Sequence, residues 1–308
     1  MSSQAVALPH ALKGDRRELD SKSGRVSYYT AGPNDPGALP PLLLIHSVNA
    51  AAGAHEMRPL YDHYRQERVV YAPDLPGYGF SERSERLHTP RLMTDAVHAL
   101  TEEIKSRHGG GRIDALALSL SSEFLARAGV EDDRSYRSLA LISPTGFNRK
   151  EFRNDEPGSN RGKPTVRRIF TQPWLGRNLF RLLTSRPSVR FFLEKTWGSK
   201  NIDETMFEYS CLTARQPGAM WAPFDFLSGF LFSADLGAVY PSLQQPVWMV
   251  HGVRGDFTDY RLKHKFEDRA NWRIRQFDSG ALPHFEMPAT FVHEYSEFLA
   301  AAQGCSEL

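Results

Sequence analysis

The chain has 308 residues, of which 41% are hydrophobic and 24% are charged, and its formal net charge is +2. This is the composition of an ordinary globular protein with enough residues for one large domain or two smaller ones. The near-neutral balance argues against a dedicated nucleic-acid binder, and no window approaches the ~18–20 apolar residues of a membrane span. The N-terminus lacks the apolar stretch of a signal peptide, and the two cysteines, Cys211 and Cys305, suggest no disulfide framework. We therefore expect a cytoplasmic protein that needs no cofactor and no metal.

The predicted elements alternate between strands and helices. Residues 1–20 are polar and unpatterned, which predicts a flexible N-terminal arm, and a strand is expected over Gly24–Thr30. Short apolar runs then predict buried strands over Pro41–Ile45, Val69–Ala72, Ile113–Leu118, Leu139–Ser143, Pro246–His251 and Trp272–Phe277. Helices are expected over Thr89–Arg107, with Thr89 as N-cap and Pro90 at the first helical position, and over Ser121–Gly129 and Pro288–Ala302.

This alternation predicts an α/β fold, with a mainly parallel central sheet flanked by helices. One segment interrupts it, because residues 148–235 have only helix and loop patterns. We interpret them as a helical cap inserted into a core formed by residues 21–147 and 236–308. The cap carries 14 Lys/Arg against 9 Asp/Glu, which indicates either a solvated helical face or a preference for acidic or lipid-like substrates. Its stretch Trp221–Phe232 returns to the sheet, so some of these side chains are expected to face the site.

Ser119 is the candidate nucleophile. It lies in the run Ala117-Leu-Ser-Leu-Ser121, directly after a predicted buried strand and before a helix. A nucleophile elbow needs this context, because the sharp turn strains the serine backbone and projects its hydroxyl away from the sheet. Ala117 and Ser121 are small enough for the crowded positions two residues on either side. Ser121 and Ser122 remain alternatives, although Ser121 would place the large side chain of Glu123 at a crowded position.

Two further loops supply a candidate acid and a candidate base. Asp256 follows the strand Pro246–His251, and His284 follows the strand Trp272–Phe277. Since active sites of such sheets lie beyond the carboxyl ends of the strands, Ser119, Asp256 and His284 are expected to meet there as a catalytic triad. Asp259 is the next candidate for the acid.

These motifs resemble those of the α/β-hydrolase superfamily, in its serine-nucleophile branch. The order Ser, Asp, His is that of the superfamily, and Asp74-Leu-Pro-Gly-Tyr-Gly-Phe-Ser81 is similar to its D-x-P-G-x-G-x-S turn. The run Leu42–Asn49 resembles its first strand with the oxyanion loop, although Ser47 replaces the usual glycine. The resemblance implies an α/β-hydrolase fold and an oxyanion hole formed by the backbone N–H groups of Val48 and Leu120. Asp256 lies one residue further from Gly252 than in the most familiar spacing.

The leading functional prediction is an esterase that cleaves a carboxylic ester or thioester of a medium-sized, largely apolar small-molecule substrate through an acyl-enzyme on Ser119. One alternative is a carbon–carbon bond hydrolase of β-diketone-like or ring-cleavage products. Another is a ligand-binding protein of the same fold with little turnover. The sequence leaves the natural substrate and the oligomeric state open, a homodimer being one alternative.

Overall fold

The computed structural model describes residues 7–33 and 39–304. Its centre is a sheet of eight strands in the order β1-β2-β4-β3-β5-β6-β7-β8, in which β1, β2 and β4 pair antiparallel and the other neighbours pair parallel. The strands are β1 (Asp15–Ser21), β2 (Gly24–Ala31), β3 (Leu42–Ile45), β4 (Val70–Asp74), β5 (Ile113–Leu118), β6 (Tyr136–Ile142), β7 (Val247–His251) and β8 (Trp272–Gln276).

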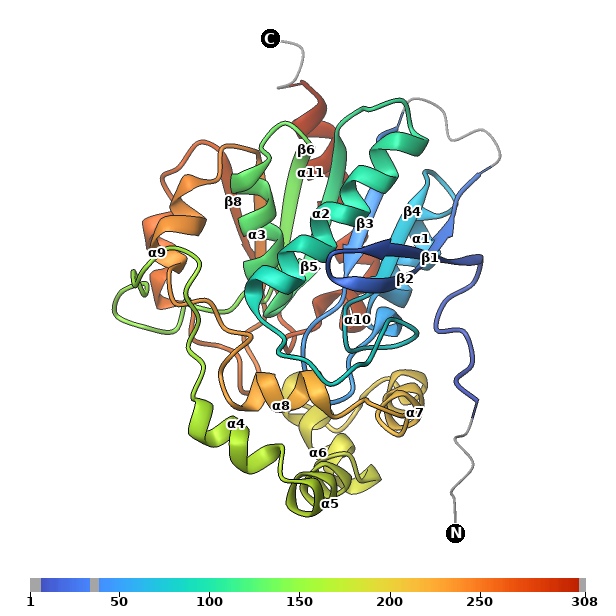
Figure 1. The fold of residues 1–308 in the computed structure, drawn as a ribbon. Helices are drawn as coiled ribbons and strands as arrows, with labels where there is room; N and C mark the ends of the chain where they lie inside the picture. The colour runs from blue at the N-terminus through green and yellow to red at the C-terminus, as the bar shows by residue number, and fades with distance from the viewer. Residues whose placement is uncertain (1–6, 34–38, 305–308) are drawn as a thin grey trace.

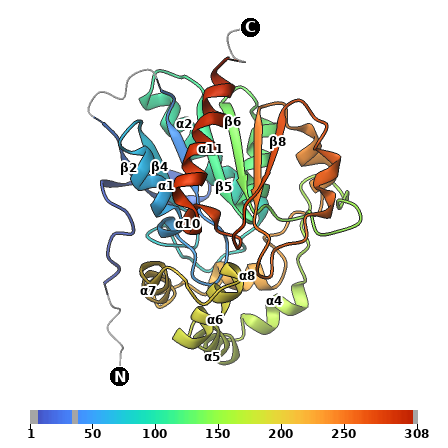
Figure 2. The same cartoon turned by 180° about the vertical axis from the view of Figure 1, so that it is seen from behind.

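The central strands are buried on both faces because helices cover both sides of the sheet. In β3, Leu43 and Ile45 enter one apolar cluster, whereas Leu42 and Leu44 enter the cluster on the opposite face. This alternation follows from the two-residue period of a strand. The first cluster packs against α2 (Pro90–Arg107) and α3 (Ser121–Glu131), and the second packs against α1 (Arg58–Tyr64) and α11 (Pro288–Gly304). Figure 1 is seen from the side of α2 and α3, and Figure 2 from the side of α1 and α11.

The predicted α/β class and the helix after Thr89 are confirmed. Thr89 has extended backbone angles, and its side chain accepts a hydrogen bond from the N–H of Leu92 at 3.2 Å. Pro90 occupies the first helical position, where its missing N–H costs no hydrogen bond. The helix ends just before the glycine run 109–111.

A helical insertion separates β6 from β7. It contains α4 (Pro164–Phe170), α5 (Pro173–Leu183), α6 (Arg186–Trp197), α7 (Glu204–Thr213) and α8 (Trp221–Leu227), followed by α9 (Leu236–Val239) and η2 (Tyr240–Ser242). Figures 1 and 2 place α4–α8 together at one end of the molecule, beyond the ends of the strands. The bounds 148–235 stay a prediction. The remaining helices are η1 (Ala54–Met57), η3 (Arg261–Lys265) and α10 (Pro283–Glu286).

The predicted N-terminal arm is wrong for its last residues. Asp15–Ser21 forms the edge strand β1, which pairs along its whole length with β2 through a hairpin at Lys22-Ser23. Gly24 closes this hairpin with φ of 87°, a value that glycine adopts without strain. The strand has no apolar pattern in the sequence, because most of its residues are charged or polar. Leu19, its only apolar residue, packs on the core. Residues 1–6 of the predicted arm lie outside the described part of the chain.

Two smaller predictions concern cysteine and membranes. Cys211 is a buried free thiol, and Cys305 lies outside the described residues. Among the helices that the structure describes, none is long and apolar enough to cross a membrane.

Candidate active site

Ser119 lies at a strained turn between β5 and α3. Its φ is 56°, in the left-handed region that L-residues rarely adopt, and its N–H donates a hydrogen bond to the Ile142 carbonyl at 2.7 Å. Ala117 and Ser121 on either side are completely buried, so larger side chains would have no room there. Ser119 itself is half-buried and lines a cavity of about 170 Å³. The turn therefore has the backbone and exposure of a nucleophile elbow.

The two competing serines have structural hydroxyl groups. Ser121 Oγ donates a hydrogen bond to the His46 carbonyl at 2.6 Å, and Ser122 Oγ donates to the Ala117 carbonyl at 3.3 Å. Both residues are fully buried. No hydrogen bond of the Ser119 hydroxyl is found with any described residue, so it stays the candidate nucleophile of the three.

The backbone N–H groups of Val48 and Leu120 have the properties of an oxyanion hole. Both residues line the cavity that Ser119 enters. Neither N–H takes part in a hydrogen bond within residues 7–33 and 39–304. Leu120 also lies at the N-terminus of α3, where the helix dipole favours negative charge. Two buried, unpaired donors beside a serine can stabilise a developing oxyanion.

Glu56 holds the loop that carries Val48. Its carboxylate is buried and accepts hydrogen bonds from the N–H of Ser47 at 2.7 Å and from the side-chain amide of Asn49 at 2.9 Å. Burial raises the pKa of Glu56, and these donors oppose the rise. Ser47, which replaces the usual glycine, is thus fixed by an acid from η1. The role of Glu56 was not predictable, because nothing in the neighbouring sequence distinguishes it from a surface glutamate at a helix start.

His284 contacts the main-chain carbonyl of Glu56 and no carboxylate among the described residues. Its Nε2 donates a hydrogen bond to the Glu56 main-chain carbonyl at 2.9 Å, and its Nδ1 is buried without a partner among the described residues. Complete burial lowers the pKa of His284 to about 4, and the bond to Glu56 opposes this effect. The ring is therefore neutral at pH 7, with one nitrogen free to accept a proton.

The structure does not bring Asp256 to His284. The Asp256 side chain is 54% exposed, and its Oδ1 lies 3.5 Å from Nζ of Lys195. Its N–H donates to the Lys195 carbonyl, so the loop after β7 is attached to α6 of the insertion. Gly255, with φ of 82°, stands where the more familiar spacing has the acid, and the extra residue displaces Asp256 outward. The alternative, Asp259, is paired with Arg261 at 2.6 Å.

The insertion supplies much of the wall of the site. Phe226 and Phe232 line the same cavity as Ser119, so two side chains of the stretch Trp221–Phe232 lie at the candidate site. A second, mostly apolar cavity of about 340 Å³ adjoins it and also contains Asp256. The two cavities share the lining residues Asn49, Glu56, Leu193, Thr196, Phe226 and Phe257.

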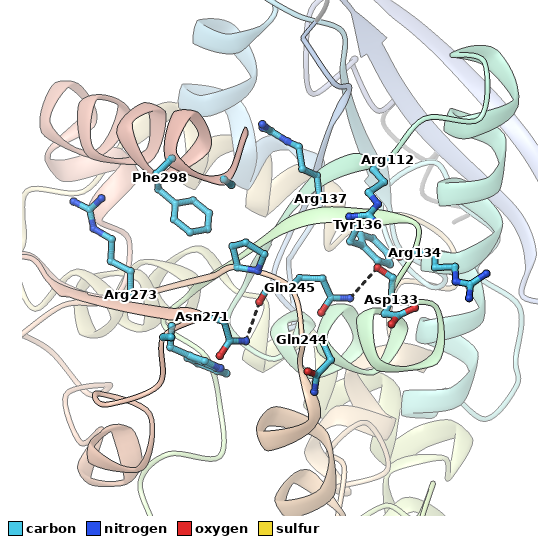
Figure 3. A pocket seen from close by; sticks show the side chains of 15 residues that line it. Arg112, Asp133, Arg134, Tyr136, Arg137, Gln244, Gln245, Asn271, Arg273 and Phe298 are labelled. Atoms are coloured by element: carbon cyan, nitrogen blue, oxygen red, sulfur yellow. Dashed lines mark hydrogen bonds between the residues drawn. The ribbon is translucent and has the colours of Figure 1, made fainter. Parts of the chain in front are cut away.

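A larger cavity, of about 690 Å³, lies at the amino ends of the strands, opposite the end that carries Ser119 (Figure 3). It is bordered by residues at the amino ends of β6 and β8 and by Phe298 of α11. Figure 3 shows Arg134 and Arg273 on opposite sides of it, and Arg137 is engaged by the buried Asp114. None of the predicted site residues lines this cavity, and ligands of such sheets bind at the carboxyl ends of the strands. Across the described ranges, no group of three or more His, Cys, Asp or Glu is placed to hold a metal ion.

Comparisons with known proteins agree with this architecture. The chain is similar to a serine hydrolase involved in carbazole degradation (TM-score 0.71, 15% identity, covering 93% of this chain and 99% of that one). It is also similar to the enol-lactonase of Burkholderia xenovorans, with a TM-score of 0.68 and 15% identity over 92% of this chain and 100% of that one. A carboxylesterase of Bacillus subtilis is similar as well, with a TM-score of 0.66 and 16% identity over 94% of this chain and 92% of that one. No curated protein matches the sequence. A profile of the alpha/beta hydrolase family matches residues 42–294. The chain therefore belongs to the alpha/beta hydrolase family.

Proposed function

We propose that the protein is a serine hydrolase that cleaves a carboxylic ester or thioester through an acyl-enzyme on Ser119. The observation that carries the proposal is the left-handed Ser119 facing a cavity beside two unpaired N–H groups, those of Val48 and Leu120. The esterase and enol-lactonase among the similar structures support the same chemistry by analogy.

In the proposed mechanism, His284 removes the Ser119 proton through the ring nitrogen that carries no hydrogen. Ser119 Oγ attacks the carbonyl carbon, and the oxygen that becomes negative is stabilised by the N–H groups of Val48 and Leu120. The proton passes from His284 to the leaving alcohol or thiol as the bond breaks. Water then attacks the acyl-enzyme by the same steps and releases the acid. At rest, the Glu56 carbonyl accepts the other ring hydrogen and positions the imidazole. This hydrogen is the one that an acid would accept in a complete triad.

We further propose that Asp256 completes the triad when the loop after β7 moves. The loop would release Lys195 and bring the Asp256 carboxylate to His284, where it stabilises the imidazolium. A salt bridge with an exposed lysine is weak, so it opposes this movement little.

Covalent labelling with a fluorophosphonate probe tests the proposal. Wild type, Ser119→Ala and His284→Ala would be compared by intact-protein and peptide mass spectrometry. We expect an adduct on Ser119 that requires His284. An adduct on Ser121 would place the nucleophile elsewhere, and turnover of esters without any serine adduct would reject the acyl-enzyme.

Two alternatives have a specific observation in their favour. The likeness to a serine hydrolase involved in the degradation of carbazole, a ring compound, keeps a hydrolase of ring-cleavage products as an alternative, which turnover of a vinylogous diketone in preference to aryl esters would identify. The separation of Asp256 from His284 favours a ligand-binding protein with little turnover. Tight ligand binding with negligible hydrolysis would identify that case.

A further inference from the structure

The insertion exposes a cluster of large apolar side chains. We call this cluster the apolar patch; it consists of Ile169, Trp174, Leu175, Leu182, Phe191 and Phe192 on α4–α6. These are six of the twelve large hydrophobic side chains that are exposed in the described structure, and Trp174 and Leu182 are 79% and 68% exposed. Scattered exposed apolar residues are ordinary, but a cluster of this size marks an interaction surface. Figures 1 and 2 show that α4–α6 form the end of the molecule farthest from the sheet.

The internal packing of α5 leaves the patch uncovered. Its inner face is buried through Phe180, whose ring lies edge-on to Phe224 of α8 at 5.9 Å between centroids. Trp174, Leu175 and Leu182 lie on the remaining surface of the same helix and stay exposed. The helix therefore presents large apolar side chains to solvent as well as to the protein, a pattern that packing within the chain does not explain.

The segment that carries the patch has charged residues of one sign. Residues 157–193 contain eight Lys/Arg and no Asp or Glu. Three of these cations pair with acids of other segments, but the exposed Arg168, Arg177 and Arg181 form no ion pair with any described residue. Exposed tryptophan and leucine beside unpaired arginine is the composition of helices that lie in the headgroup region of an anionic bilayer. A second copy docking through the same face would bring like charges together.

The patch adjoins the entrance to the site. Phe192 belongs to the patch and also lines the 340 Å³ cavity, together with the exposed Leu227 and Phe257. That cavity shares six lining residues with the cavity of Ser119. An amphiphile held at the patch thus lies beside an apolar route toward the nucleophile.

We propose that the α4–α6 face docks on an anionic lipid surface and that ester substrates with an acyl chain enter the site from that surface. The docking proposal rests only on the apolar patch and on the unpaired arginines beside it. The entry of substrate also rests on the proposed esterase function.

Vesicle flotation of the full chain tests the docking. We expect binding to phosphatidylcholine vesicles that contain phosphatidylglycerol, little binding to phosphatidylcholine alone, and weakening with salt. The double variant Arg177→Gln/Arg181→Gln should bind about tenfold more weakly or worse. The matched control Arg112→Gln/Arg134→Gln has the same net charge as the double variant. Its residues border the cavity at the amino ends of the strands, so it should bind vesicles as wild type does. Equal weakening by both pairs would show that only net charge matters and would overturn the proposal.

Tryptophan fluorescence tests which surface touches the lipid. Trp174 is the one exposed tryptophan among the five, so a blue shift and quenching by brominated lipid on vesicle binding should report on it. Trp174→Phe should keep the binding and lose this signal. Absence of the signal in wild type, or a dimer in ultracentrifugation that Leu182→Ser dissociates, would overturn lipid docking.

A catalytic control separates this proposal from the proposed function. Ser119→Ala should bind vesicles like wild type, because docking needs no chemistry. Vesicle binding without Ser119 labelling would reject the esterase and keep the docking. Labelling of Ser119 without vesicle binding would reject the docking and keep the esterase.

Discussion

At the scale of single residues, the carboxylate of Asp256 tests the proposed triad most directly. Because Asp256 is 54% exposed and its one ion pair among the described residues is with Lys195, Asp256→Asn should leave the unfolding midpoint unchanged. If the loop closes onto His284 during catalysis, kcat should fall by about two to four orders of magnitude. Steady-state kinetics with an aryl ester measures this, and Asp259→Asn serves as the control. A rate near that of wild type would mean that His284 works with the Glu56 carbonyl alone.

Glu56 leads to a different prediction at the same scale. Its two carboxylate oxygens each accept a hydrogen bond from a donor, one from Ser47 and one from Asn49. In Glu56→Gln, an amide NH₂ would face one of these donors, so the loop carrying Val48 should shift. We expect kcat to fall about 10²-fold with little change in KM, since the loss of one oxyanion donor typically has this effect.

The matched control is Glu123→Gln, which changes another buried glutamate whose carboxylate bonds Thr145 and Ser233 instead of the loop that carries Val48. An equal fall of kcat in both variants, or a rise in KM alone for Glu56→Gln, would contradict the positioning role.

These residues also show how much of the site the sequence reveals. Ser119 could be predicted as a candidate because a serine with small neighbours after a buried strand is typical of a nucleophile elbow. Glu56 was not, because its role arises from the packing of η1 against a loop and leaves no local pattern. The contact between Asp256 and His284 depends on the path of a glycine-containing loop, which the spacing of residues does not determine.

At the scale of elements, α3 connects the core to both ends of the insertion. Glu123 of α3 accepts hydrogen bonds from the Thr145 hydroxyl, just after β6, and from the N–H of Ser233 at 2.8 Å, where the insertion returns. One turn later, Arg127 forms a buried salt bridge with Asp235. The same helix therefore follows the candidate nucleophile Ser119 and holds the two points where the insertion leaves and returns.

Glu123 makes the stability of this connection dependent on pH. Burial raises the pKa of Glu123 from 4.5 to about 7, so between these values the folded state binds more protons than the unfolded state. Stability should therefore fall as pH rises from about 4.5 to 7. Glu123→Gln should remove this fall, and its stability relative to wild type should improve by an amount on the order of 2 kcal/mol between pH 5 and pH 8.

Urea unfolding at a series of pH values measures this difference. Glu102→Gln, a change at an exposed position of α2, is the control. If wild type and Glu123→Gln show the same dependence on pH, the buried carboxyl group is not the cause.

The strands and helices could be predicted where apolar runs in the sequence indicate burial. β3, β5 and β7 are apolar on both faces, and helices on both sides of the sheet require this. β1 was missed because an edge strand can be stable with one apolar residue when its backbone pairs with β2. The short helices α7 and α8 form where the insertion packs on the core, and such tertiary contacts override weak local patterns.

At the scale of the whole molecule, the site exists only where the core and the insertion meet. The core supplies Ser119 and the unpaired N–H groups, whereas the insertion supplies Leu193 and Phe226 to both cavities. Reactivity and substrate choice should therefore be separable, with the core determining the first and residues 148–235 the second. Sequence patterning predicted an insertion over the site, but the division of the space into two cavities depends on individual side chains that approach from both parts.

Phe226→Ala tests this separation. Phe226 lines both cavities and stacks at an angle on Phe232, with 5.2 Å between ring centroids. Its removal should join the two spaces, so the ratio of kcat/KM for p-nitrophenyl octanoate to that for the acetate should rise about tenfold, because a longer acyl chain then fits. Fluorophosphonate labelling of Ser119 should persist. Phe230→Ala is the matched control, since Phe230 belongs to the same segment but lines neither cavity. A chain-length preference that stays the same in Phe226→Ala, or that changes equally in Phe230→Ala, would show that this part of the insertion does not select the substrate.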